Sequence, residues 1–219
     1  MLPNVLDNAS RQALPLKLCI VENGDAIGAC AKHCVDPDLL LTSEHHQATA
    51  KNEAVSAIKK LGGGLISFWD DDDEYAAGFL GELLSQKSRA TVVGKRRHLV
   101  RLSDGLYLFD RENANRESTW LHGPTCMVQA DDCIEFPKIA PNDDGEWCKA
   151  MREAGASFWA TSIWNYTYNR TGQNHVWAAS DLMVRVALGS AWKLEDDRGT
   201  FVQAPTDDEV LDALADGTI

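Results

Sequence analysis

Five consecutive acidic residues, Asp70 to Glu74, directly follow a short apolar run, Leu65 to Trp69. The run is too short for a helix and follows the glycines 62–64, which predicts a buried strand that ends at the aspartates. Ligands bind just beyond the carboxyl ends of strands in open parallel sheets, where crowded carboxylates favour a hard cation such as Mg²⁺. The alternative interpretation is a solvated helix N-terminus, where acidic side chains cap free amides and complement the helix dipole.

A second acidic pair, Glu22 and Asp25, lies where another apolar run, Leu16–Val21, comes to an end. One acidic turn is common in proteins. Two acidic strand ends at the same edge of one sheet could share a metal ion, so we expect these two groups to lie close together.

Strand and helix patterns alternate along the first hundred residues. Apolar, β-favouring runs predict strands, and amphipathic spacing predicts the helices between them. This order favours crossover connections and an α/β fold with a mostly parallel sheet. The expected strands are 16–21, 39–41, 65–69 and 90–93, and the expected helices are 25–33, 44–61 and the segment from 75 to 84.

The segments CIVENGDAIGACAK and LISFWDDDDEYAAGFLGELL, joined by LLLTSEHHQATAKNEAVSAIKKLGG, resemble the Toprim domain of bacterial primases, topoisomerases and small RNA-maturation nucleases. The resemblance implies Mg²⁺-dependent phosphoryl transfer on nucleic acid, as a nuclease or a nucleotidyl transferase. It implies Glu22 as the general acid and base. Mg²⁺ would be held by Asp70 with Asp72, or by Asp71 with Asp73, with Asp25 nearby.

The same acidic segment also resembles the pocket of a phospho-receiver domain. A receiver would need a phosphorylatable aspartate on a later strand. The later candidates, Asp104 and Asp110, lie at the turn or strand end of a hairpin expected over 98–109. The Toprim resemblance therefore accounts for more of the sequence.

A basic stretch follows the acidic one. Its charges predict contacts with a phosphate backbone, although basic residues also protect exposed strand edges from aggregation. His98, inside this stretch, fits a structural role better than a catalytic one. The residues expected to contact nucleic acid are Lys95, Arg96, Arg97 and Arg101.

The rest of the chain predicts a small α+β domain. We expect domain boundaries at 1–110 (α/β, Toprim-like), 111–142 (a connecting segment) and 143–219 (an aromatic-rich αββα unit). Trp159-Ala160 and Arg185-Val186-Ala187 give this unit a resemblance to small accessory domains of bacteriophage proteins. Its aromatic side chains could stack on bases, but filling a core is their more common role. The unit comprises a helix at 143–154, strands within 158–168 and 174–178, a helix capped by Ser180 or Asp181, and a final helix opened by the capping box at 206–209.

Composition limits the function further. A formal net charge of -12 argues against extensive wrapping by nucleic acid, so any such contact should be local. The sequence has neither a membrane-length apolar run nor the pattern of a signal peptide in MLPNVLDNAS, which predicts a cytoplasmic protein with reduced cysteines. The alternative function is a non-catalytic, phage-type protein that binds a host protein through its acidic and aromatic surface.

Cysteine and histidine spacing adds no site of its own. Cys30, His33 and Cys34 supply too few ligands for a zinc site, so structural thiols are expected. A hydrolase that uses Cys126 with His122 or His175 finds no support in the local sequence.

Overall fold

The computed structural model describes residues 2–33, 36–43, 47–103, 105–109, 114–138, 143–170, 192–194 and 201–203. The elements, in chain order, are α1 (Leu2–Arg11), β1 (Cys19–Asn23), η1 (Gly24–Ala26), α2 (Ala29–Lys32), β2 (Leu39–Ser43), α3 (Gln47–Lys60), β3 (Leu65–Ser67), β4 (Glu74–Tyr75), α4 (Phe79–Gln86), η2 (Lys87–Arg89), β5 (Val92–Gly94), β6 (His98–Leu102), β7 (Gly105–Phe109), β8 (Arg116–Glu117), η3 (Gly123–Thr125), β9 (Met127–Gln129), α5 (Asp143–Glu153), β10 (Phe158–Ala160), β11 (Tyr166–Asn169), β12 (Trp192–Leu194) and β13 (Phe201–Gln203).

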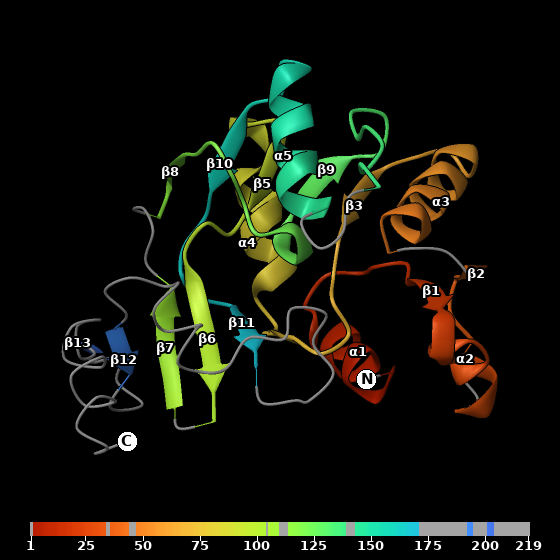
Figure 1. Cartoon of the computed structure of the whole chain (residues 1–219), viewed down its shortest axis with the longest axis horizontal. Helices are drawn as coiled ribbons and strands as arrows, with labels where there is room; N and C mark the ends of the chain where they lie inside the picture. Colours follow the sequence, from red (N-terminus) through yellow and green to blue (C-terminus); the bar gives the residue numbers. More distant parts are fainter. Residues whose placement is uncertain are drawn as a thin grey trace.

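A five-stranded mixed sheet forms the centre of the molecule, in the order β3-β9-β5-β10-β8 (Figure 1). β10 runs parallel to β5, whereas β9 runs antiparallel to both β3 and β5. The α/β class predicted from the sequence is confirmed at this level. The expected mostly parallel sheet is not observed, because β9 lies between β3 and β5 and runs antiparallel to both.

Helices cover both faces of this sheet. Adjacent residues of a strand point to opposite faces, and β5 shows this directly. Val92 packs in one core cluster with Trp147 of α5 and Val55 of α3, whereas Val93 packs in a second cluster with Phe79 of α4. Figure 1 shows α5 and α4 on opposite sides of the sheet, so the centre is a three-layer α/β/α arrangement.

A six-stranded sheet in the order β13-β12-β7-β6-β11-β4 lies beside it. The predicted hairpin is present as β6 and β7, which pair antiparallel. β11 runs parallel to β6 and antiparallel to the two-residue strand β4. β4 directly follows the aspartates 70–73, so its pairing with β11 ties one end of the acidic turn to this sheet.

The first two strands stand apart from both larger sheets. β1 and β2 form a two-stranded parallel sheet in which Cys19 lies opposite Leu39, and α3 lies against both strands. In the described chain, β1 therefore does not share a sheet with β3, contrary to the expectation from the alternating pattern.

The structure does not confirm a separate second domain after residue 142. Trp147 lies in the same core cluster as Val92, and β10 pairs with β5 of the central sheet. The predicted strand over 158–168 divides into β10 and β11, which belong to different sheets. Asn165, directly before β11, has a φ of 70°, a left-handed conformation that interrupts the extended backbone between the two strands. The strand expected at 174–178, the helix after Asp181 and the capping box at 206–209 lie outside the described residues.

Among the described residues, none of the helices combines the length and the apolar character that crossing a bilayer requires.

Candidate functional site

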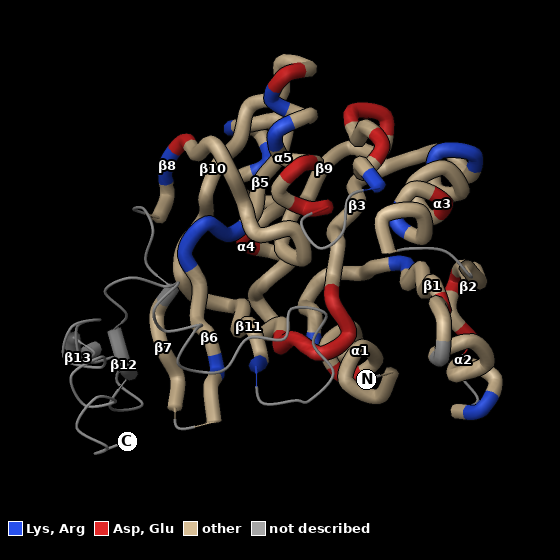
Figure 2. Tube along the Cα trace, in the orientation of Figure 1, with Lys and Arg blue, Asp and Glu red and all other residues tan. Residues whose placement is uncertain are grey.

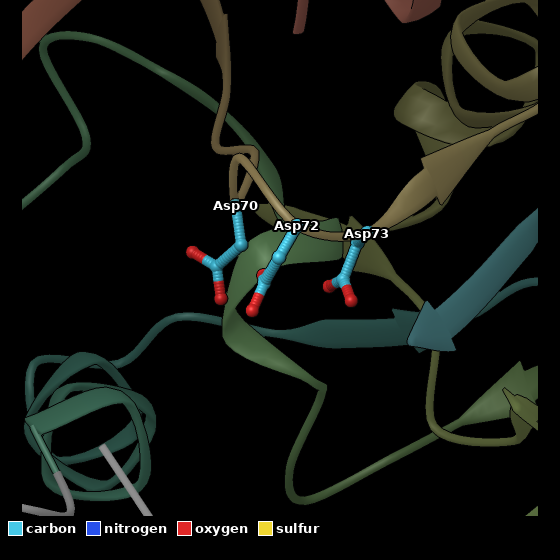
Figure 3. A group of neighbouring side chains, drawn as sticks. All are labelled: Asp70, Asp72 and Asp73. Atoms are coloured by element: carbon cyan, nitrogen blue, oxygen red, sulfur yellow. The ribbon is translucent and has the colours of Figure 1, made fainter. Parts of the chain in front are cut away.

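The aspartate turn, Asp70 to Asp73, joins β3 to β4 and brings three carboxylates together. Oxygen atoms of Asp70, Asp72 and Asp73 all lie within 4.8 Å of one another. Figure 3 shows these three side chains pointing to the same side of the turn. Asp71 is exposed and does not belong to this group. The geometry therefore gathers Asp70 with Asp72 and leaves Asp71 outside, which distinguishes between the two pairings that the sequence left open.

Asp73 is the buried member of the group and is held from two sides. One of its carboxylate oxygens accepts a hydrogen bond from the hydroxyl of Tyr166, and the other accepts the backbone N–H of Asn169 at 2.9 Å. Both donors belong to β11. These bonds fix the Asp73 carboxylate and attach the end of the turn to the six-stranded sheet.

Crowding and burial raise the pKa values of the clustered carboxyls. Burial, together with the charges of Asp144, Asp72 and Asp71, raises the pKa of Asp70 to about 7 against the opposing charge of Lys51. Burial and the neighbouring Asp70 also raise the pKa of Asp73 well above its usual range. A site that disfavours its own negative charge in this way gains most from a bound cation.

Three charged residues beside the turn were not singled out from the sequence. Lys51 of α3 donates to Asp144 at 2.6 Å and lies 3.5 Å from Asp143, and both acids belong to the first turn of α5. Although burial opposes the ammonium form, the charges of Asp144, Asp70 and Asp143 raise the pKa of Lys51. Lys51 is therefore a fixed positive charge between the aspartate turn and α5.

Gly123 leaves the space that Asp144 occupies. A Cβ atom at Gly123 would lie 2.2 Å from the Asp144 carboxylate, closer than any real contact. Glycine at this position therefore lets the Asp144 carboxylate reach its place next to Lys51.

Glu22 lies elsewhere and has local partners. Its carboxylate accepts the backbone N–H groups of Gly28 and Cys30, both at 2.6 Å, and these bonds lower its pKa. In the described part of the chain, the carboxylates that could share a metal ion are those of the aspartate turn, and Glu22 is not among them. Asp25 lies in η1, and its side chain is outside the described residues.

The four predicted phosphate contacts do not form one exposed basic surface. Lys95 is fully buried, and its ammonium donates to Glu82 at 2.8 Å and to the carbonyl of Ser162 at 3.0 Å. Arg101 pairs with Glu74 at 2.9 Å, and Arg96 lies over the ring of Trp120. Arg97 also has a partner within the fold. Binding of nucleic acid by these residues stays a prediction.

Two imidazoles stack near the site, of which His98 is buried and His122 is half-buried. The rings of His98 and His122 lie 4.5 Å apart, and both also contact Tyr166, which holds Asp73. Burial lowers the pKa of His122 to about 4 and that of His98 well below its usual value. The charge of Asp144 raises the pKa of His122, and the charge of Lys51 lowers it. The charges of His122 and Lys95 lower the pKa of His98. The burial of His98 fits the structural role expected from the sequence, which stays a prediction.

We expect acid to destabilise the protein through this pair. The pKa of His122 is lower in the folded chain than the value near 6.5 in the unfolded chain, so its contribution is lost as pH falls from about 6.5 to about 4. At pH 5 the loss should be about 2 kcal/mol for His122. Asp70, whose pKa is raised, increases the free energy of unfolding as pH falls and so opposes this loss. A variant comparison removes that contribution. The measurement is therefore urea unfolding of His122→Asn and of the wild type from pH 7.5 to 4.5. A parallel pH dependence in the two proteins would contradict the assignment.

No family model matches the chain, and no curated protein matches it. Among solved structures, residues 1–349 of S. aureus TarS in complex with UDP-GlcNAc superpose with a TM-score of 0.57 at 15% identity, covering 80% of this chain and 56% of that one. The same TarS fragment in complex with UDP gives a TM-score of 0.55 at 16% identity, covering 76% and 56%. A Desulfovibrio desulfuricans G20 protein, provisionally assigned as a nucleotide-diphospho-sugar transferase, gives 0.46 at 14% identity, covering 85% and 80%.

The likeness to TarS corrects the resemblance drawn from the sequence. The chain spans just over half the length of the TarS fragments that it matches. At this identity the similarity shows the fold alone, and that fold is of the type found in TarS rather than in Toprim domains. The expectation of Mg²⁺-dependent phosphoryl transfer on nucleic acid was therefore wrong, and the alternative of a host-binding phage protein gains no better support.

Proposed function

We propose that this chain binds a nucleoside diphosphate-sugar through a divalent cation held by the aspartate turn, and that it transfers the sugar. The observation that carries the proposal is the convergence of Asp70, Asp72 and Asp73 within 4.8 Å, at the end of a sheet strand. The fold supports it, because the TarS structure that this chain resembles is a complex with UDP-GlcNAc. GT-A-like transferases commonly hold divalent metal ions through an acidic D-x-D motif, and Asp70-Asp71-Asp72 has that form.

The residues present fit a hard divalent cation. Carboxylate oxygens are the ligands that Mg²⁺ and Mn²⁺ prefer, and Mg²⁺ is commonly bound by only one or two carboxylates together with water and substrate phosphates. Asp70 and Asp72 would be these ligands. Asp73, whose two oxygens already accept hydrogen bonds, would not be a ligand but would orient the turn that carries the ligands. The bound cation would neutralise negative charge on the diphosphate.

Lys51 would also offset the negative charge of the diphosphate, through its own ammonium rather than through the cation. Its ammonium is held in place by Asp144 and acts on Asp70 through space. A fixed cation in a partly buried site attracts an anionic ligand more strongly than a mobile surface lysine does. We therefore assign Lys51 to diphosphate binding.

The direct test is the binding of UDP with and without metal. We expect calorimetry to detect UDP binding in Mn²⁺ or Mg²⁺, and to detect little or none in EDTA. UMP is the matched control, because it keeps the base and ribose but lacks the second phosphate that a cation would bridge. UDP binding that is equal with and without metal would contradict the metal site. No UDP binding in either condition would contradict the proposed function.

A further inference from the structure

Three amide side chains, two on α1 and one directly after its last residue, are aligned along the acidic turn. Asn4, Asn8 and Gln12 are four residues apart, which places them on one face of the helix. All three form hydrogen bonds with the main chain of residues 71–80, some sixty to seventy positions away in sequence. Figure 2 shows the acidic segment running directly beside α1.

Asn8 makes the central contact. It is completely buried, and it is the one buried residue of α1. Its Nδ2 donates to the carbonyl of Asp73 at 2.8 Å, and its Oδ1 accepts the N–H of Tyr75 at 3.1 Å. One side chain thus satisfies two backbone groups where the turn becomes β4.

Asn4 and Gln12 extend the contact in both directions. Asn4 Nδ2 donates to the carbonyls of Asp71 at 3.0 Å and Asp73 at 2.8 Å. Gln12 Nε2 donates to the carbonyl of Ala76 at 3.0 Å, and its Oε1 accepts the N–H of Leu80 at 3.2 Å. The helix therefore contacts the backbone from the turn itself to the start of α4.

These bonds bear on the carboxylates because they fix the backbone that carries them. With the carbonyls of Asp71 and Asp73 held toward α1, the side chains of Asp70, Asp72 and Asp73 gather at one point. Like charges at that distance repel, so a loosely held turn would separate them. Hydrogen bonds with amides require a defined geometry, whereas an apolar contact would allow the turn to slide.

We propose that α1 positions the aspartate turn for cation binding, with Asn8 as the principal positioning residue. This inference rests on the proposed function. It assigns to Asn8 no contact with metal or substrate, only the orientation of the groups that make that contact. Groups that orient metal ligands typically change metal affinity by about 10- to 100-fold when they are replaced.

The test is Asn8→Leu, which keeps the number and branching of the side-chain heavy atoms and removes the hydrogen bonds. We expect Mn²⁺ to bind about 10- to 100-fold more weakly, measured by calorimetry on protein that thermal unfolding shows to be folded. Ser10→Ala is the matched control, since it removes an exposed hydrogen bond of the same helix without a change of charge. It should leave Mn²⁺ affinity unchanged.

The outcomes separate the two proposals. If the wild type binds Mn²⁺ and Asn8→Leu binds it equally well, the positioning role is wrong and the proposed function stands. If the wild type binds no Mn²⁺, the proposed function fails and the inference fails with it. Should Asn8→Leu not fold, Asn4→Ala replaces it, because Asn4 holds the same carbonyl of Asp73 from a more exposed position. Unchanged Mn²⁺ affinity in a folded Asn4→Ala protein would then overturn the inference.

Discussion

Replacing Asp70 with asparagine should weaken Mn²⁺ binding by about 100-fold, equal to about 2.7 kcal/mol, because it removes one of the two proposed carboxylate ligands. The metal-free variant should be at least as stable as the wild type. Burial and the neighbouring acids disfavour the ionised form of Asp70, and a neutral amide does not carry that cost. Calorimetry with Mn²⁺ and thermal unfolding in EDTA measure the two effects separately. UDP binding in Mn²⁺ should fall together with metal affinity.

Asp71→Asn is the matched control for that experiment. Asp71 lies in the same turn and carries the same charge, but its side chain is exposed and lies outside the carboxylate group. Its replacement should change Mn²⁺ affinity by no more than a few-fold, through the loss of a nearby negative charge. If both variants lost affinity equally, net charge rather than coordination would explain the binding.

The elements that the sequence predicted well are those with a clear local pattern. The helix expected at 44–61 is α3, the helix at 143–154 is α5, and the hairpin around Gly105 is β6 and β7. Each buries one face on a neighbour, so the spacing of its apolar residues reflects its environment. Val92 and Val93 of β5 show the same principle on a strand covered on both faces.

Two elements were not predicted from the sequence. β9 has three residues and lies in what the sequence suggested was a connecting segment, and its partners β3 and β5 are remote along the chain. α1 does carry apolar residues at helical spacing, Leu2, Val5, Leu6 and Ala9, but its fully buried residue is the polar Asn8. Pro3 near its start was an available signal, because proline favours the first turn of a helix.

The acidic half of the site was visible from the sequence, whereas its surroundings were not. Clustered aspartates after an apolar strand predicted a cation site, with a solvated helix N-terminus as the alternative interpretation. Lys51 is one of several lysines on α3, and Asp144 has the ordinary position of an acid in a first helical turn. Only the packing of α3 and α5 beside the turn distinguishes these residues. Glu22 was paired with the aspartates because both were expected at the same edge of one sheet, and the separate β1-β2 sheet overturns that expectation.

The sequence also did not indicate that Lys95 is buried and paired with Glu82. Lys95→Ala should lower the free energy of unfolding by about 3 to 5 kcal/mol, because the Glu82 carboxylate, only 16% exposed, would lose its counter-charge. For a chain of this size that corresponds to a fall of roughly 10 °C in Tm. Urea unfolding and calorimetric melting at pH 7 measure both quantities.

Two comparisons isolate the buried charge as the cause. Arg101→Ala breaks an ion pair of similar length, but Arg101 and Glu74 are 41% and 42% exposed, so it should cost no more than about 1 kcal/mol. Lys95→Met with Glu82→Gln removes both buried charges, and the amide oxygen can still accept the N–H of Ser162, so much of the lost stability should return. If Lys95→Ala cost no more than Arg101→Ala, the pair would not be a structural element.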